Sequence, residues 1–214
     1  MKRPAISRSL LQCGFHLLYN QLAFSYDLVA DLVSFGQWPA WRRHVIPLLI
    51  EGSTLDLAFG TGGLLADLHA RGREQVVGID LSPFMGRIAG RRLRQRGCLL
   101  RLVQGQAQQL PFGNQTFANV IATFPAEFIL SPGTVLSVAR VLRPGGCLLI
   151  VVKGCLKGPV GLRQLIRWAY QATGQTSWQE NSLVTRLNAG GFQVEWVPVS
   201  AEGAASLLVV ARRT

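Results

Sequence analysis

The chain has 214 residues, 49% hydrophobic and 15% charged, which argues against disorder and suits one domain with a substantial core. Its formal net charge of +11 is compatible with nucleic acid, anionic lipid or an anionic small substrate, although a preference for Arg can equally reflect genomic bias. No apolar run approaches the roughly 18 residues that span a bilayer. The four cysteines form no C-x-x-C pair and no secretory signal is recognisable, so we expect a cytoplasmic protein without a metal site.

The first 24 residues are basic and then apolar. A helix beginning near Ser9 would gather four apolar side chains on one side: Leu11, Phe15, Leu18 and Leu22. We expect this side to pack on the domain. The alternative is an interfacial helix at a membrane, with the basic residues of segment 1–8 next to anionic headgroups.

A second helical region, 26–33, breaks at the aromatic segment 34–39 and resumes over 40–50. An aromatic break of this kind usually belongs to the core, but beside a ligand site it can form a lid. We expect residues 1–50 to form a helical cap or substrate segment, and residues 51–214 to form one domain.

From Thr54 onward, apolar strand-like runs alternate with helical periodicity. Strands are expected over 54–58, 75–80, 99–104, 117–123, 147–153, 192–199 and 205–212, and helices over 62–72, 83–97, 132–142, 159–173 and 180–190. This alternation predicts an α/β protein with a Rossmann-like, doubly wound, seven-stranded and mostly parallel sheet, with helices on both faces. The last two strands have too short a link for a parallel crossover, so the final strand should be antiparallel.

The first strand runs into a turn of small residues, Ala58 to Gly62, and then into a helix. Glycine lets the backbone approach a ligand closely, and free N–H groups at a helix start favour electron-rich groups. Such a turn is weak evidence alone, but the next strand ends in Asp80, about 20 residues on. We therefore predict that Asp80 binds ribose hydroxyls; the alternative, a helix N-cap, is already supplied by Ser82.

Two further strand ends carry candidate ligand contacts, because an open α/β sheet binds its ligand at the carboxyl ends of its strands. Gln106 and Ala107 follow the third strand, where an adenine ring could dock, although an ordinary polar loop would have the same composition. Thr123 ends the fourth strand, where a reacting group would sit.

Four motifs together carry a family resemblance. They are the Leu-Asp-Leu-Ala-x-Gly-Thr-Gly turn at 55–62, an acid followed by a Met-containing helix at 80–85, Leu-Pro-Phe at 110–112 and Arg-Val-Leu-x-Pro-Gly-Gly at 140–146. The set resembles the class I S-adenosylmethionine-dependent methyltransferases, most closely the ubiquinone/menaquinone-biosynthesis C-methyltransferase group. A looser match upstream involves residues 26–27, 34–36 and 41.

The resemblance implies S-adenosyl-L-methionine as cofactor and methyl transfer (EC 2.1.1.-) to a small, apolar or quinone-like acceptor. It implies that Thr61 and its neighbours hold the methionine end and that Met85 packs near the adenine. Tyr26 would cover the sulfonium, and Glu127 is the best-placed candidate base, although it is also an ordinary helix-start acid. The implied cofactor-binding set is Asp56, Ala58, Phe59, Gly60, Thr61, Gly62, Asp80, Leu81, Met85, Gln106, Ala107 and Thr123.

Three positions depart from the family pattern. Phe59 stands where a small residue is usual, so its ring either points away from the cofactor or narrows the cleft. Gln106 replaces an acid or Asn. Segment 125–128 reads Pro-Ala-Glu-Phe instead of Gly-Leu-Arg-Asn, which weakens the case for the same acceptor.

Two other functions compete with methyl transfer. A non-catalytic methyltransferase-like protein could bind a partner or membrane through its basic surface, with peripheral contact at the inner membrane face. A nicotinamide-dependent oxidoreductase is disfavoured because the turn lacks G-x-G-x-x-G. The Arg run over 83–97 and the Arg42–His44 segment are expected to be solvated, and without aromatic interleaving a nucleic-acid partner is not favoured.

Overall fold

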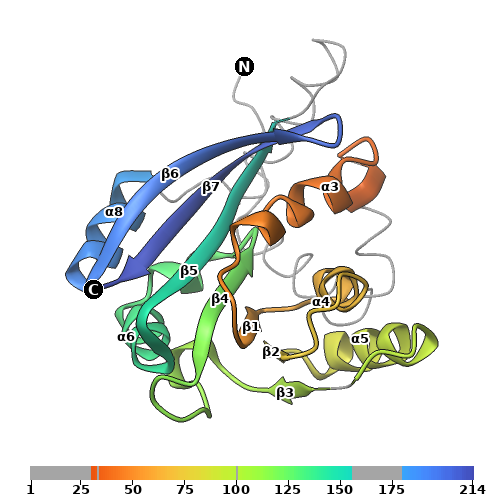
Figure 1. Cartoon of the computed structure of the whole chain (residues 1–214), viewed down its shortest axis with the longest axis horizontal. Helices are drawn as coiled ribbons and strands as arrows, with labels where there is room; N and C mark the ends of the chain where they lie inside the picture. The colour runs from red at the N-terminus through yellow and green to blue at the C-terminus, as the bar shows by residue number, and fades with distance from the viewer. Residues whose placement is uncertain (1–29, 33, 100, 156–179) are drawn as a thin grey trace, which may run out of the picture.

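A computed structural model describes residues 30–32, 34–99, 101–155 and 180–214 of the chain (Figure 1). The predicted helices near Ser9 and over 159–173, most of the predicted helix 26–33, and the candidate residue Tyr26 lie outside these described residues.

Seven strands form one sheet in the order β3-β2-β1-β4-β5-β7-β6. Their bounds are β1 Thr54–Leu57, β2 Val76–Asp80, β3 Leu102–Gln104, β4 Phe117–Thr123, β5 Leu142–Cys155, β6 Phe192–Ala201 and β7 Ala204–Arg213. Strands β1 to β5 pair in parallel, whereas β7 runs antiparallel to both β5 and β6. The predicted doubly wound sheet with an antiparallel last strand is confirmed.

The strand order reverses between β1 and β4. From β1 the chain proceeds outward to β3 at one edge and then returns to place β4 on the other side of β1. The crevice beyond the carboxyl ends of strands at such a reversal is where open α/β sheets bind ligands. The turn after β1 and the end of β4 both lie there.

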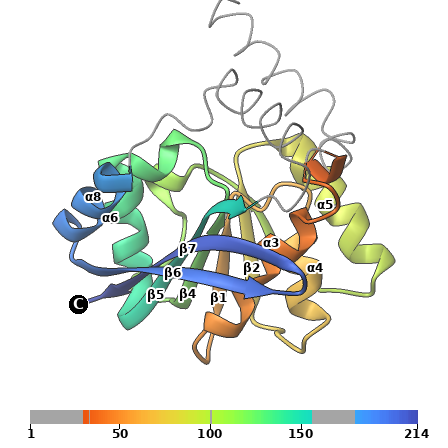
Figure 2. The same cartoon turned by 90° about the horizontal axis from the view of Figure 1, so that it is seen from above.

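Helices cover both faces of the sheet (Figures 1 and 2). One group comprises α3 Trp38–Arg43, α4 Gly63–His69 and α5 Pro83–Gln95, and the other comprises α6 Pro132–Val141 and α8 Glu180–Ala189. Three short 3-10 helices connect elements: η2 Ile46–Leu48, η3 Ala107–Gln109 and η4 Glu127–Leu130. The predicted helix over 40–50 is thus two short pieces, α3 and η2.

Two apolar layers enclose the sheet, and alternate residues of a single strand serve each layer. In β5, Leu148 and Ile150 join the layer under α6 and α8, while Leu149 and Val151 join the layer under α4 and α5. A strand whose two faces are both buried reads as a continuous apolar run, which is how β5 appears in the sequence.

Candidate functional site

The turn after β1 has an unusual backbone. Ala58 has φ 61°, in the left-handed region that costs energy for a residue with a Cβ, and Gly60 and Gly62 have φ 55° and 75°. The turn is held against β2, because the amide of Ala58 donates to the Ile79 carbonyl at 2.8 Å. A Cβ on Gly62 would lie 2.7 Å from the Ala89 Cβ, so glycine also permits α5 to approach.

Asp80 closes this turn from the end of β2. Its carboxylate oxygens accept hydrogen bonds from the amides of Gly60 and Ser82, both at 2.8 Å. Ser82 is the N-cap of α5 and its hydroxyl accepts from the Met85 amide, as predicted. The Asp80 carboxylate is therefore fixed between the glycine turn and the start of α5.

Asp56 is a buried carboxylate in β1, only 1% exposed. Neither of its oxygens has a hydrogen-bond partner within the part of the chain that the structure describes. Burial raises the pKa of this carboxyl to about 7; the nearby Asp80 also raises it, and Arg42 lowers it. A buried acceptor with no donor is costly, so the site favours a ligand that supplies donors or positive charge.

Arg42 supplies the positive charge of the site. Its Nε donates to Asp67 Oδ2 of α4 at 2.9 Å, which fixes the guanidinium. The guanidinium lies over Gly63 at the start of α4, since a Cβ on Gly63 would be only 2.6 Å from Arg42 Nη1. A helix start and a guanidinium both favour a carboxylate or phosphate.

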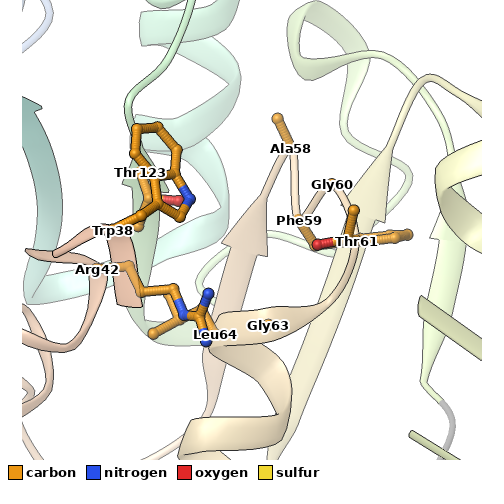
Figure 3. A pocket seen from close by; sticks show the side chains of 9 residues that line it. All are labelled: Trp38, Arg42, Ala58, Phe59, Gly60, Thr61, Gly63, Leu64 and Thr123. Atoms are coloured by element: carbon orange, nitrogen blue, oxygen red, sulfur yellow. The ribbon is translucent and has the colours of Figure 1, made fainter. Parts of the chain in front are cut away.

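A pocket opens between α3 and the turn (Figure 3). Trp38 and Arg42 of α3 lie on one side, and the turn residues lie on the other. The lining residues are Trp38, Arg42, Ala58, Phe59, Gly60, Thr61, Gly63, Leu64 and Thr123. Trp38 also stacks on Phe124, with ring centroids 4.1 Å apart, and Phe124 itself has a positive φ of 49°.

Trp38 and Arg42 are site residues that were not predicted from the sequence. Trp38 belongs to the aromatic break that was expected to be core or a lid, and Arg42 to a segment that was expected to be solvated. That second expectation is wrong for both Arg42 and His44. His44 is only 3% exposed and contacts Ser206 Oγ at 2.7 Å through Nδ1. The usable signal was spacing: Trp38 and Arg42 are four residues apart and so share one side of a helix.

Phe59 does not fill the pocket with its ring. The side chain is buried in the core layer under α4 and α5, and its Cδ1 would lie 2.7 Å from a Cβ placed on Gly78 of β2. Of the two predicted orientations, the structure has the ring directed into the core.

Thr61 is tied to α5, because its hydroxyl accepts a hydrogen bond from Arg92 Nη1 at 3.0 Å. Arg92 is therefore a second arginine that contacts the turn, although the sequence suggested a solvated Arg run. The remaining members of the run, Arg87, Arg91, Arg94 and Arg96, are exposed.

The other predicted site residues are spread over the same edge. Leu81 and Gln106 are exposed at the ends of β2 and β3, and Ala107 begins η3. Met85 is fully buried within α5, and Glu127 is exposed at the start of η4. Of the pocket-lining residues, the sequence predicted five: Ala58, Phe59, Gly60, Thr61 and Thr123.

The described residues contain neither a metal-ligand cluster nor a membrane-spanning helix. Across residues 30–155 and 180–214, leaving aside positions 33 and 100, no group of three or more His, Cys, Asp and Glu side chains is arranged to hold a metal ion. Within the same described residues, no helix has the length and apolarity needed to cross a bilayer.

Sheet order, glycine turn and strand-end acid together define a Rossmann-like methyltransferase fold. A family model described as "Methyltransferase domain" matches residues 54–146, which include the turn, Asp80 and Thr123. A solved geranyl diphosphate methyltransferase, in complex with GPP and sinefungin, has the same fold: its TM-score is 0.64 at 18% identity, over 82% of this chain and 78% of that one.

Two curated relatives match at the sequence level. The chain is 36% identical over 142 residues to the ubiquinone/menaquinone biosynthesis C-methyltransferase UbiE of Idiomarina loihiensis, covering 63% of this chain and 57% of the relative. It is also 36% identical over 142 residues to the demethylmenaquinone methyltransferase of Thermus thermophilus, covering 63% of each. The chain thus aligns with less than two thirds of the length of these relatives. Over residues 54–146 the predicted resemblance to the class I S-adenosylmethionine-dependent methyltransferases is confirmed.

Proposed function

We propose that the protein binds S-adenosylmethionine and directs its methyl group to a small, apolar, lipid- or quinone-like acceptor. One observation carries the cofactor assignment: the buried Asp56 carboxylate without a donor, beside the turn and close enough to Arg42 for their charges to interact. The methionine end of this cofactor carries an ammonium and a carboxylate, which complement an acid and an arginine.

The residues present fit the whole cofactor. We assign Asp56 to its ammonium, Arg42 and the start of α4 to its carboxylate, and Asp80 to its ribose hydroxyls. The exposed side chains of Leu81 and Gln106 would flank its adenine together with Ala107, while the fully buried Met85 would support the adenine site from beneath. Ala58, Gly60, Thr61 and Gly62 bring the backbone close enough for contact, and Phe59 leaves the space open by packing into the core.

The chemistry asks mainly for alignment. S-adenosylmethionine supplies an electrophilic methyl group, and a good nucleophile needs orientation and exclusion of water more than acid–base help. Trp38 and Thr123 line the pocket beside the turn and would orient the acceptor. If the acceptor must lose a proton, we propose Glu127 as the base and Tyr26 as the residue that covers the sulfonium.

The acceptor class rests on two supports. One matching relative is named as a ubiquinone/menaquinone biosynthesis C-methyltransferase and the other as a demethylmenaquinone methyltransferase. The stacked rings of Trp38 and Phe124 give the pocket an aromatic wall, which suits a flat or apolar group. Segment 125–128 departs from the family pattern, so an acceptor different from theirs is the alternative.

Calorimetric titration with S-adenosylmethionine tests the cofactor assignment. We expect binding to the wild-type chain, weaker binding to Asp56→Asn and Arg42→Leu, and none of NAD. Arg186→Leu, an exposed arginine on α8, is the matched control and should bind normally. No binding by the wild-type chain at high micromolar cofactor would leave the non-catalytic binding protein as the better proposal.

A second surface favours peripheral contact with an anionic membrane. Residues 81–126 contain six arginines and no Asp or Glu. Phe84, Arg87, Arg91 and Arg94 of α5 are all exposed and recur at helical spacing on one side, with the Arg87 guanidinium 4.4 Å from the Phe84 ring centroid. Arginines beside an exposed ring suit the interface of an anionic bilayer.

Flotation with vesicles tests this contact. We expect the chain to float with vesicles of mixed phosphatidylglycerol and phosphatidylcholine, and not with phosphatidylcholine alone. Arg91→Gln/Arg94→Gln should reduce flotation, whereas Arg143→Gln/Arg186→Gln, with the same loss of charge elsewhere, should not. Equal flotation of both variants, or tighter binding to DNA than to vesicles, would contradict the proposal. Deleting residues 1–24 tests separately whether that segment contributes.

A further inference from the structure

The tip of the β6–β7 hairpin contacts the end of α3 through side chains outside the pocket lining. The hairpin turn is the two-residue link Glu202-Gly203, since Ala201 pairs with Ala204. The Glu202 carboxylate accepts a hydrogen bond from Arg43 Nε at 3.0 Å and lies 3.9 Å from Arg71 beyond α4. Hairpin, α3 and the end of α4 thus meet at one carboxylate.

A second contact reinforces the first. His44, directly after α3, makes a 3.1 Å contact from Nε2 to the Ala201 carbonyl and a 2.7 Å contact from Nδ1 to the Ser206 hydroxyl. Because a carbonyl only accepts, Nε2 must donate to Ala201. Both partners belong to the hairpin.

Glu202 has a strained backbone conformation at the position from which its side chain contacts Arg43. Its φ is 52° and that of Gly203 is 72°, which is the pattern of a type I′ turn. Asn, Asp or Gly is preferred at the first position of such a turn, because they tolerate a positive φ. Glutamate is a poor choice for the turn itself, but its longer side chain reaches Arg43.

The contacted helix carries two lining residues of the pocket. α3 has only six residues, too few to hold its own position, and Trp38 and Arg42 on it face the glycine turn. Trp41 fixes the helix further by lying against β5, where a Cβ on Gly154 would be 2.1 Å from its ring. A shift of α3 would therefore move the guanidinium that lies over Gly63.

We propose that Glu202 is a positioning residue, which sets the place of α3 through Arg43 and so the affinity of the pocket for its ligand. The inference rests on the proposed function, because the ligand used to read it is S-adenosylmethionine. Glu202 contacts Arg43 and is not among the residues that line the pocket, so it acts through the position of α3 and not by touching the ligand.

Glu202→Asn separates positioning from simple stability. Asn suits the positive φ, so the variant should be at least as stable to heat as the wild type, yet its dissociation constant for S-adenosylmethionine should rise about threefold to fivefold, the effect of losing one partly exposed ion pair. KM for the cofactor should rise with little change in kcat. Glu202→Gln keeps the strain and should bind equally weakly.

Two comparisons make the result specific. Gln115 is another exposed residue with positive φ, 56°, in a turn before β4, so Gln115→Asn relieves the same strain and should leave binding unchanged. Arg43→Gln should weaken binding as Glu202→Gln does, and the double variant should be no weaker than either single one. Glu202→Asn with wild-type affinity, or Gln115→Asn with reduced affinity, would overturn the inference.

Amide hydrogen exchange measures how firmly α3 is held in the ligand-free protein. Glu202→Asn should speed exchange of the amides of Trp41 and His44, which bond back to Gln37 and Ala40, and Gln115→Asn should not. If the wild-type chain fails to bind S-adenosylmethionine, the proposed function fails while this measurement still decides the inference. Unchanged exchange in Glu202→Asn would sink it.

Discussion

The ring of Phe59 lies against Gly78, one strand away in β2. A Cβ on Gly78 would lie 2.7 Å from Phe59 Cδ1 and 2.8 Å from Leu65 Cδ1, so the glycine provides the space that the ring occupies. A large residue in a turn of small ones is accommodated because its neighbour in β2 has no side chain.

Gly78→Ala should therefore destabilise the fold by about 1–3 kcal/mol through overpacking. Because Phe59 belongs to the glycine turn, displacing its ring should disturb the turn, so cofactor affinity should fall as well. Phe59→Leu should partly relieve the effect of Gly78→Ala, giving a double variant less destabilised than the sum of the two single ones in denaturant unfolding. Phe117→Leu removes a buried ring of the opposite core layer, so its destabilisation should add to that of Gly78→Ala. If the effects of Phe59→Leu and Gly78→Ala are also additive, the contact between Phe59 and Gly78 is contradicted.

Asp56 should make stability depend on pH. Its pKa is about 7 in the folded chain against an ordinary 3.8, so the folded state holds the proton more tightly than the unfolded state. The free energy of unfolding should therefore fall as pH rises from about 4 to about 7, by up to about 4 kcal/mol from this group. Asp56→Asn should remove that share of the dependence.

Urea unfolding of both proteins between pH 4 and pH 8, without ligand, measures the difference. The free energy of unfolding of Asp56→Asn, relative to that of the wild type, should rise steadily from pH 4 to about pH 7 and stay higher above it. S-adenosylmethionine should reverse the order by stabilising the wild type more strongly. A pH-independent difference between the two proteins would show that the carboxyl is not buried as described.

Gly63→Ala should weaken cofactor binding without harming the fold. The new Cβ would collide with the end of the flexible Arg42 side chain. The side chain can move aside without disturbing the fold, but its guanidinium then leaves its place over residue 63. We expect affinity to drop on the order of tenfold, the effect of one charged hydrogen bond. Gly86→Ala, a glycine of α5 with open space around it, should stabilise the helix by up to about 1 kcal/mol and leave affinity unchanged.

Thr61→Val should show whether the tie to α5 orders the turn. The substitution keeps the volume but removes the hydroxyl that accepts from Arg92. We expect affinity for S-adenosylmethionine to fall about threefold to tenfold, in line with one hydrogen bond to a charged group, while Thr61→Ser stays near the wild type. Equal affinities of the two variants in calorimetry would show that the hydroxyl has no such role.

Strand and helix periods were enough to predict the sheet, but not the ends of its elements. The expected helix 62–72 ends at His69, and Gly72 follows with φ 74° in the turn to β2. The expected strand 99–104 is only Leu102–Gln104, because its neighbour β2 pairs with it only from Gly78 to Asp80. Periodicity reports which face is buried, whereas hydrogen bonding to neighbours decides where an element stops.

The glycine turn and the acid of the next strand are local in sequence, and both could be predicted because their chemistry depends on backbone freedom and fixed spacing. The spacing of Trp38 and Arg42 places them on one side of a helix, but nothing in their own segment shows that this side faces the turn. Phe59 was ambiguous for the same reason: its direction depends on a glycine in another strand.

By itself the sequence determined a mostly parallel α/β sheet, a ligand edge at Gly60, Gly62 and Asp80, and the resemblance that fits them. The tertiary structure alone decided which side chains complete the pocket: the ring of Phe59 packs into the core, and Arg42 lines the pocket with its guanidinium held by Asp67. The division has a physical cause. Backbone conformation is encoded by neighbours along the chain, whereas the direction of a side chain is decided by packing and charge between segments that meet only in the fold.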